Sequence, residues 1–310
     1  MNSHEQQSFW GPDILSNLML ITRANFLLLT IVIVAAGLSA SLYAHGAFNP
    51  LDALLVLIGA LFTHMAVNVF NNYFDYRSKI DARTTKTPFS GGVSILVEGK
   101  MKPATAFGVG LLCLIGAGVI GVYFLARQFY PLFPILLYGL VAICLYTPVL
   151  SRIHALSEIV AGTGFGFMGL GAYVTQARVV DATGIAVFVP VSILVGLLLF
   201  LNEFPDVEAD RAAGRKHVVI LLGRKTSAWI YVVFLVATYL SILLSVAMTA
   251  APLAVLISLI TTPIAYKAMR IVLKNYDRIP ELVPAIGLNV TIITSTIALL
   301  AAGFLIGFYI

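Results

Sequence analysis

Nine apolar stretches dominate the sequence, and each is long enough, or nearly long enough, to cross a lipid bilayer as a helix. They cover residues 26–44, 51–70, 104–126, 130–146, 156–173, 183–200, 228–250, 252–269 and 282–310. A spanning helix needs about 20 predominantly apolar residues. Because 60% of the residues are apolar and only 11% are charged, the composition is far from that of a soluble globular protein. The sequence therefore predicts an all-α polytopic membrane protein of about nine helices, bundled around a central cavity.

The lysines and arginines test this topology, because cytoplasmic loops of membrane proteins carry an excess of basic residues. With nine spans, one side holds the N-terminus and the loops that follow each even-numbered span. All but two of the 19 basic residues fall on that side, the exceptions being Arg127 and Arg178. We therefore expect the N-terminus, these loops and the mouth of the cavity to face the cytoplasm, in the cell inner (plasma) membrane. This placement accounts for the net charge of +5 without a nucleic-acid partner.

The rest of the chain shows few signs of further organisation. No low-complexity segment or long linker divides it, so we expect a single domain over residues 1–310. The first ten residues lack a basic segment, which predicts a short polar leader and no cleavable signal peptide. Cys113 and Cys144 are isolated within apolar stretches and indicate neither a disulfide nor a metal site. The oligomeric state stays open.

Polar side chains gather where the second and the sixth apolar stretches end. The first group is Asn68, Asn71, Asn72 and Asp75, with Asp81 six residues further on, and the second is Asn202, Asp206 and Asp210. Asn68, Asn71, Asn72 and Asp75 stand at i, i+3, i+4 and i+7, and the second group stands at i, i+4 and i+8, so each set lies on one face of a helix. Since both stretches end on the same side of the membrane, we expect the two groups to lie at one mouth of the bundle.

Carboxylate and amide oxygens without clustered Cys or His favour hard cations, above all Mg²⁺. Proteins bind Mg²⁺ through one or two carboxylates together with substrate phosphates, and basic side chains suit the remaining phosphate oxygens. The basic residues interleaved with the acids are Lys79, Arg83, Lys86, Arg211, Arg215 and Lys216. The pattern predicts a site for a diphosphate whose apolar tail lies among the helices. Solvated loop charges are the simpler alternative, but two similar motifs on one side favour a site.

The two motifs resemble those of the UbiA superfamily of intramembrane prenyltransferases, which lie on the second and sixth of nine helices. The resemblance covers nearly the whole chain. It implies that two Mg²⁺ ions are held on a prenyl diphosphate by Asn71, Asp75, Asp81, Asn202, Asp206 and Asp210. Asn72 departs from the pattern, because many members have aspartate there, and this removes one formal charge from the first motif.

The resemblance also implies an activity, the transfer of a polyprenyl group to an aromatic acceptor. Asp75 and Asp206 would be central to the ionisation of the diphosphate, and Tyr146 would stabilise the allylic cation. Asn68, Asn71, Asn72 and Arg23 would contact the substrates. The six-residue spacing to Asp81 and the Tyr146-Thr-Pro element resemble the menaquinone branch, whose acceptor is 1,4-dihydroxy-2-naphthoate. Alternative acceptors within the superfamily are 4-hydroxybenzoate, homogentisate, chlorophyllide and a glycerol phosphate lipid, and the prenyl chain length stays open.

Several residues also have a purely structural interpretation. Arg23 can be a membrane anchor, residues 87–92 can cap the site or only turn the chain, and His64 is interpreted as a hydrogen-bonded interior histidine. An ion-coupled transporter is the rival function from another class. Transporters place ionisable groups near the middle of the membrane, whereas the acids here lie at one mouth, so the enzyme is the favoured interpretation.

Overall fold

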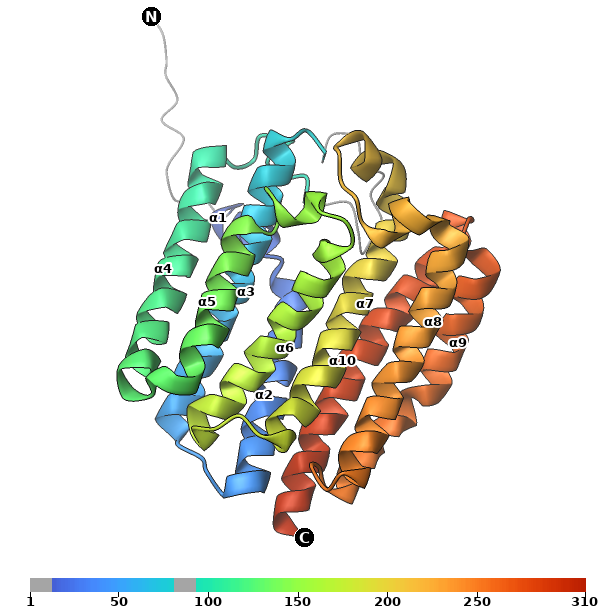
Figure 1. Cartoon of the computed structure of the whole chain (residues 1–310). Coiled ribbons are helices and arrows are strands. Elements are labelled where there is room, and N and C mark those ends of the chain that lie inside the picture. Colours follow the sequence, from blue (N-terminus) through green and yellow to red (C-terminus); the bar gives the residue numbers. More distant parts are fainter. Residues whose placement is uncertain (1–12, 81–92) are drawn as a thin grey trace, which may run out of the picture.

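The structure, a computed structural model, describes residues 13–80 and 93–310, and every regular element in these ranges is a helix (Figure 1). The α-helices are α1 (Asp13–Ile21), α2 (Leu27–His45), α3 (Pro50–Arg77), α4 (Pro103–Arg127), α5 (Phe129–Leu145), α6 (Leu156–Ala177), α7 (Ala182–Ala212), α8 (Val218–Ala247), α9 (Thr262–Asn275) and α10 (Ile279–Tyr309). Three 3₁₀ helices are η1 (Ala24–Phe26), η2 (Leu150–Arg152) and η3 (Leu253–Thr261), which continues into α9. This confirms the predicted all-α class.

Each predicted apolar stretch contains one helical segment. Seven of the helices in the described ranges are long and apolar enough to cross a membrane, and the chain is a multi-pass membrane protein. The α3 helix has 28 residues and α7 has 31, which makes them about 42 and about 46 Å long. Because the hydrocarbon core is only about 30 Å thick, each extends beyond it, and the polar groups of both helices lie in their final turns.

Small residues let the central helices approach one another closely. A Cβ atom added to Gly37 of α2 would lie 2.2 Å from the carbonyl oxygen of Gly169 in α6. One added to Gly162 of α6 would lie 2.3 Å from the carbonyl oxygen of Ser192 in α7. No side chain fits at such distances, so the α2–α6 and α6–α7 contacts depend on glycine, as is common where membrane helices pack without a hydrophobic driving force.

Polar side chains of α2, α3, α4 and α6, together with Asp181, join the helices at one end of the bundle (bottom of Figure 1). Asp52 of α3 pairs with Arg127 of α4 at 2.6 Å. His45 of α2 lies 2.8 Å from Asp181, which precedes α7, and the Tyr173 hydroxyl of α6 donates to Asp181 at 2.7 Å. We call Asp52, Arg127, His45, Asp181 and Tyr173 the distal network. It fixes the helix ends away from the two polar motifs.

Candidate functional site

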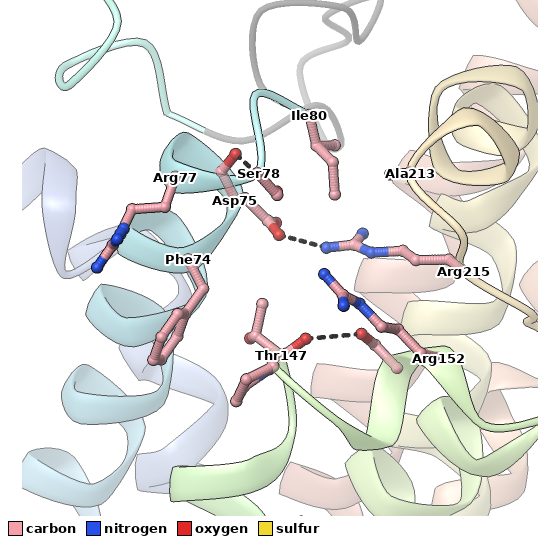
Figure 2. Close-up of a pocket in the computed structure, with 11 residues that line it drawn as sticks. Phe74, Asp75, Arg77, Ser78, Ile80, Thr147, Arg152, Ala213 and Arg215 are labelled. Carbon is pink, nitrogen blue, oxygen red and sulfur yellow. Dashed lines mark hydrogen bonds and ion pairs between the residues drawn. The ribbon is translucent and has the colours of Figure 1, made fainter.

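A pocket of about 310 Å³ lies at the end of the bundle opposite the distal network. It is bounded by the last turn of α3, the segment that follows α5 and the segment between α7 and α8 (Figure 2). Within the described ranges, its polar lining consists of Asp75, Arg77, Ser78, Thr147, Ser151, Arg152 and Arg215. A pocket with one carboxylate, three guanidinium groups and three hydroxyls suits a polyanionic ligand more than an apolar one.

The first motif reaches this pocket because α3 is continuous over its whole length. Its start is fixed by Pro50 in the first turn and by the Asn49 side chain, which accepts a hydrogen bond from the Asp52 N–H at 3.0 Å. The helix ends at Arg77, and Lys79 follows in the left-handed region with φ of 59°. Asp75 is therefore the last acid of the helix, 7% exposed, and it faces into the bundle.

Arg215 joins the two motifs. One guanidinium nitrogen lies 2.9 Å from the Asp210 carboxylate of α7, and the other bonds to the Asp75 carboxylate of α3 (Figure 2 shows the second contact). Burial alone would lower the pKa of Arg215, but the two carboxylates outweigh it and raise that pKa, so the guanidinium stays charged. Residues 140 positions apart in the sequence thus meet at one mouth, as the motif spacing predicts.

Two oxygens of the second motif remain available for a ligand. Asn202 Oδ1 and Asp206 Oδ1 are buried, and neither has a hydrogen-bond partner within the described ranges. Asp206 also lies close enough to Asp75 and Asp210 for electrostatic interaction. Buried acceptors without partners are costly, and a set of carboxylate and amide oxygens fits a hard cation such as Mg²⁺.

The described residues contain no group of three or more His, Cys, Asp or Glu side chains arranged to hold a metal ion. An all-protein cage is therefore not the kind of metal site that this part of the chain offers. Mg²⁺ rarely uses such a cage, since it binds through one or two carboxylates and completes its shell with phosphate oxygens and water. The residues present fit a cation that arrives together with a phosphorylated substrate.

The asparagines of α3 divide into two roles. The Asn68 and Asn72 amides donate to the backbone oxygens of Thr22 and Ile21 at 2.9 and 3.1 Å, just ahead of α2. Asn72 Oδ1 accepts from the Arg23 guanidinium at 3.1 Å. These two asparagines therefore hold the segment that carries Arg23, itself in the left-handed region with φ of 51°.

Asn71 links Arg23 to the pocket wall. Its Oδ1 accepts from the Arg23 guanidinium at 3.4 Å, and its amide donates to the Thr147 hydroxyl at 3.3 Å. Since Thr147 lines the pocket, Asn71 is the α3 amide best placed for a ligand there.

Replacing Asn72 with alanine should destabilise the protein by about 1–3 kcal/mol, because buried hydrogen-bond partners lose their bonds. Asn72 is 1% exposed and also accepts from the Val93 N–H at 3.4 Å. The measurement is the thermal unfolding midpoint in detergent. Asn17, which is only partly buried and donates to the Lys100 oxygen at 3.3 Å, provides the matched Asn→Ala control. An unchanged midpoint together with lost ligand binding would instead assign Asn72 to the ligand.

Three of the other predicted basic residues lie outside the pocket lining. Lys79, Arg211 and Lys216 are exposed, and Arg211 pairs with Glu208 at 3.4 Å. Asp81, Arg83, Lys86 and the 87–92 loop lie outside the described residues, so their predicted roles stay predictions.

Aromatic side chains are candidates for stabilising an allylic cation, and only some of them lie at the pocket. Phe74 lines the pocket, and Tyr146 follows the last residue of α5, where it interacts electrostatically with Arg215. Tyr138 instead bonds to Thr163 at 2.5 Å, within the bundle. His64 has the predicted interior partner, because its Nδ1 lies 2.7 Å from the Thr30 hydroxyl.

Sequence reasoning missed two residues at this site. Arg152 of η2 points into the pocket beside Arg215 (Figure 2), although the sequence marks it only as one of many basic loop residues. His217, the cap of α8, is 2% exposed and has Nε2 3.3 Å from the Asp210 carboxylate. Its position seven residues after Asp210 was the available signal, but only the turn between α7 and α8 brings it back.

Two comparisons of sequence bear on the site. The sequence pattern of the UbiA prenyltransferase family matches residues 29–290. A 1,4-dihydroxy-2-naphthoate octaprenyltransferase from Bacillus subtilis (strain 168) is 31% identical over 198 residues, which are 60% of this chain and 62% of that protein. The match thus spans less than two thirds of that relative. The UbiA prenyltransferase domain-containing protein 1 of Gallus gallus is 27% identical over 256 residues, 80% of this chain and 74% of its own.

Solved structures with the same fold cover almost the whole chain. A UbiA homolog from Aeropyrum pernix K1, in its apo form, has a TM-score of 0.70 at 16% identity, over 91% of this chain and 98% of that one. A UbiA homolog from Archaeoglobus fulgidus, bound to DMAPP and Mg²⁺, has a TM-score of 0.58 at 15% identity, over 92% of this chain and 99% of that one. At such low identity these likenesses establish the fold alone.

Proposed function

The chain belongs to the UbiA prenyltransferase family, and from this premise we propose that it transfers a polyprenyl group from a prenyl diphosphate to an aromatic acceptor, with Mg²⁺ as cofactor. The observation that carries the proposal is the convergence of Asp75 and Asp210 on Arg215 at the pocket. Asp75, an acid suited to a cation, and the guanidinium groups of Arg152 and Arg215, which suit phosphate, face one space there. The transporter alternative would need ionisable groups at mid-membrane, whereas these acids lie at the end of long helices.

The metal ligands in this proposal are those of the two motifs. Asn71 and Asp75 would hold the cation from α3, and Asn202, Asp206 and Asp210 would hold it from α7, with Asp81 as a further ligand and two ions in all. When bound, Mg²⁺ would offset negative charge on the leaving diphosphate. The Archaeoglobus fulgidus homolog is bound to DMAPP and Mg²⁺, which supports a role for Mg²⁺ with a prenyl diphosphate.

The residues of the chain have separate tasks in the transfer. Arg215 and Arg152 bind phosphate oxygens at the pocket, and Asn71 keeps Arg23 directed toward them. The bond between the prenyl C1 and the diphosphate oxygen breaks, a bond between C1 and the acceptor ring forms, and the ring loses a proton. Phe74 and Tyr146 present aromatic faces that stabilise the allylic cation, and the packed helices exclude water from it.

For the acceptor we propose 1,4-dihydroxy-2-naphthoate, in menaquinone biosynthesis. The Bacillus subtilis relative and the Tyr146-Thr-Pro element support this choice, with the other superfamily acceptors as alternatives. The proposal includes a single domain in the cell inner membrane, with the pocket facing the cytoplasm. Its support is the placement of all basic residues except Arg127 and Arg178 on that side.

Purified protein supplied with geranylgeranyl diphosphate, 1,4-dihydroxy-2-naphthoate and Mg²⁺ should form prenylated naphthoate, and a chelator should abolish the product. The products are followed by chromatography with mass detection, and diphosphate release is measured in parallel. Release of diphosphate with 4-hydroxybenzoate or homogentisate, but not with the naphthoate, would replace the acceptor and keep the activity. If no prenyl diphosphate of any chain length reacts with any of these acceptors, the proposed activity is wrong.

A further inference from the structure

A ladder of basic side chains runs along the outer surface of α9. Lys267, Arg270 and Lys274 are all exposed and stand one turn apart. At about 100° per residue their directions fall within an arc of about 60°. We call these three residues the α9 ladder.

The opposite face of α9 packs into the bundle. Ala265, Ala268 and Val272 are each at most 1% exposed, and α9 lies at the edge of the molecule beside α8 and α10 (Figure 1). The ladder therefore faces outward, toward the lipid. It belongs neither to the pocket nor to the packing of the helices.

The surface just below the ladder is apolar. In η3, which leads into α9, Ile257 is 42% exposed and Ile260 is 70% exposed. One outward surface thus changes from apolar to cationic on passing toward the end of the bundle that holds the pocket. A phospholipid has the same order of parts, with acyl chains below and a phosphate above.

The depth of the ladder fits a headgroup as well. From Lys267 to Lys274 the helix rises about 10 Å, while each headgroup layer is about 5–8 Å thick. The ladder is thus long enough to cross a headgroup layer, and the long side chain of Lys267, at its lower end, can extend toward the phosphate level.

No acidic side chain of the described residues pairs with the α9 ladder, so the ladder is available to a lipid headgroup. Within the described ranges none of its three residues forms an ion pair. Arg270 instead lies over the Tyr266 ring, 5.9 Å from its centroid, and Tyr266 is itself 60% exposed. Aromatic and basic side chains together are typical of the membrane interface.

We propose that the α9 ladder binds the headgroup of an anionic phospholipid in the leaflet toward which the pocket opens, with the acyl chains against Ile257 and Ile260. Three cations on one face offer a phosphate several charge-assisted contacts, and basic groups near the surface favour anionic lipid. The inference does not depend on the proposed prenyl transfer.

The test uses the full chain in detergent, titrated with phosphatidylglycerol or phosphatidylcholine and followed by native mass spectrometry. Wild-type protein should retain phosphatidylglycerol preferentially. The double variant Lys267→Gln/Lys274→Gln keeps the contact between Arg270 and Tyr266, and its preference should fall about tenfold or more, since each basic residue contributes about a fivefold factor.

Two further variants make the result specific. Lys102→Gln/Lys225→Gln removes two exposed lysines from the same side of the membrane and should leave the preference unchanged. Lys267→Arg/Lys274→Arg keeps the charge and should retain it. Equal lipid preference in wild-type protein and the first double variant, with both folded by circular dichroism, would overturn the proposal. A loss of equal size in the Lys102 and Lys225 variant would do the same, because it would mean that charge number alone matters.

Discussion

Replacing Asp75 with asparagine should reduce Mg²⁺-dependent prenyl transfer by about 10²–10³-fold, the usual scale for losing a group that stabilises charge in a transition state. Asparagine keeps the shape of the side chain but removes the charge that a hard cation requires. Among the described residues, Asp75 is also the only acid that lines the pocket, so no other described residue of the lining replaces it. The measurement is kcat/KM for the prenyl diphosphate over a series of Mg²⁺ concentrations.

Asp52 provides a matched control on the same helix. It is 6% exposed and paired with Arg127, much as Asp75 is 7% exposed and paired with Arg215, but it lies in the distal network. Asp52→Asn should therefore lower the unfolding midpoint while folded protein keeps its activity. Similar activity losses in the two variants would contradict a specific role of Asp75 and would point to general loss of structure.

Removal of the Arg215 charge should lower the stability of the protein more than the substitutions of Asn72, Asp52 or Arg211. In Arg215→Gln the carboxylates of Asp75 and Asp210 face one another without a cation, and breaking a buried ion pair in this way costs about 3–5 kcal/mol. We expect a lower thermal unfolding midpoint in the presence of a chelator. Added Mg²⁺ should raise the midpoint more in the variant than in the wild-type protein, because it neutralises the same two acids.

Arg211 supplies the comparison for this experiment. It lies four residues earlier, its side chain is 55% exposed, and its pair with Glu208 is on the surface. Arg211→Gln should change the stability by at most about 1 kcal/mol. Arg215→Lys should recover only part of the loss, since an ammonium cannot bridge two carboxylates as a planar guanidinium does. Identical midpoints for Arg215→Gln and wild-type protein would contradict the bridging role.

The fold was largely predictable because hydrophobic length and basic-residue placement are local properties of the chain. The 51–70 and 183–200 stretches were predicted as spans, and α3 and α7 contain them. Both helices extend beyond these stretches, α3 to Arg77 and α7 to Ala212, because a helix can continue into polar residues after the apolar stretch ends. The polar motifs at the ends of α3 and α7 were therefore placed on the correct helices, but the predicted spans were shorter than these helices.

The site was predictable only in part, because its contacts join distant segments. Helical spacing grouped Asn68, Asn71, Asn72 and Asp75 correctly on one helix, but it did not indicate that Asn72 bonds to the backbone of Ile21. Arg152 and His217 were missed for the same reason. Each reaches the site through a turn between helices, and no periodicity relates it to the two motifs.

The distal network has a mechanical consequence for the opposite end of the molecule. If helices are held together at one end, a change in their tilt separates them most at the other end. A tilt of about 5° of a helix about 42 Å long, such as α3, displaces its far end by nearly 4 Å. A small change of tilt at the tied end would thus be amplified at the mouth.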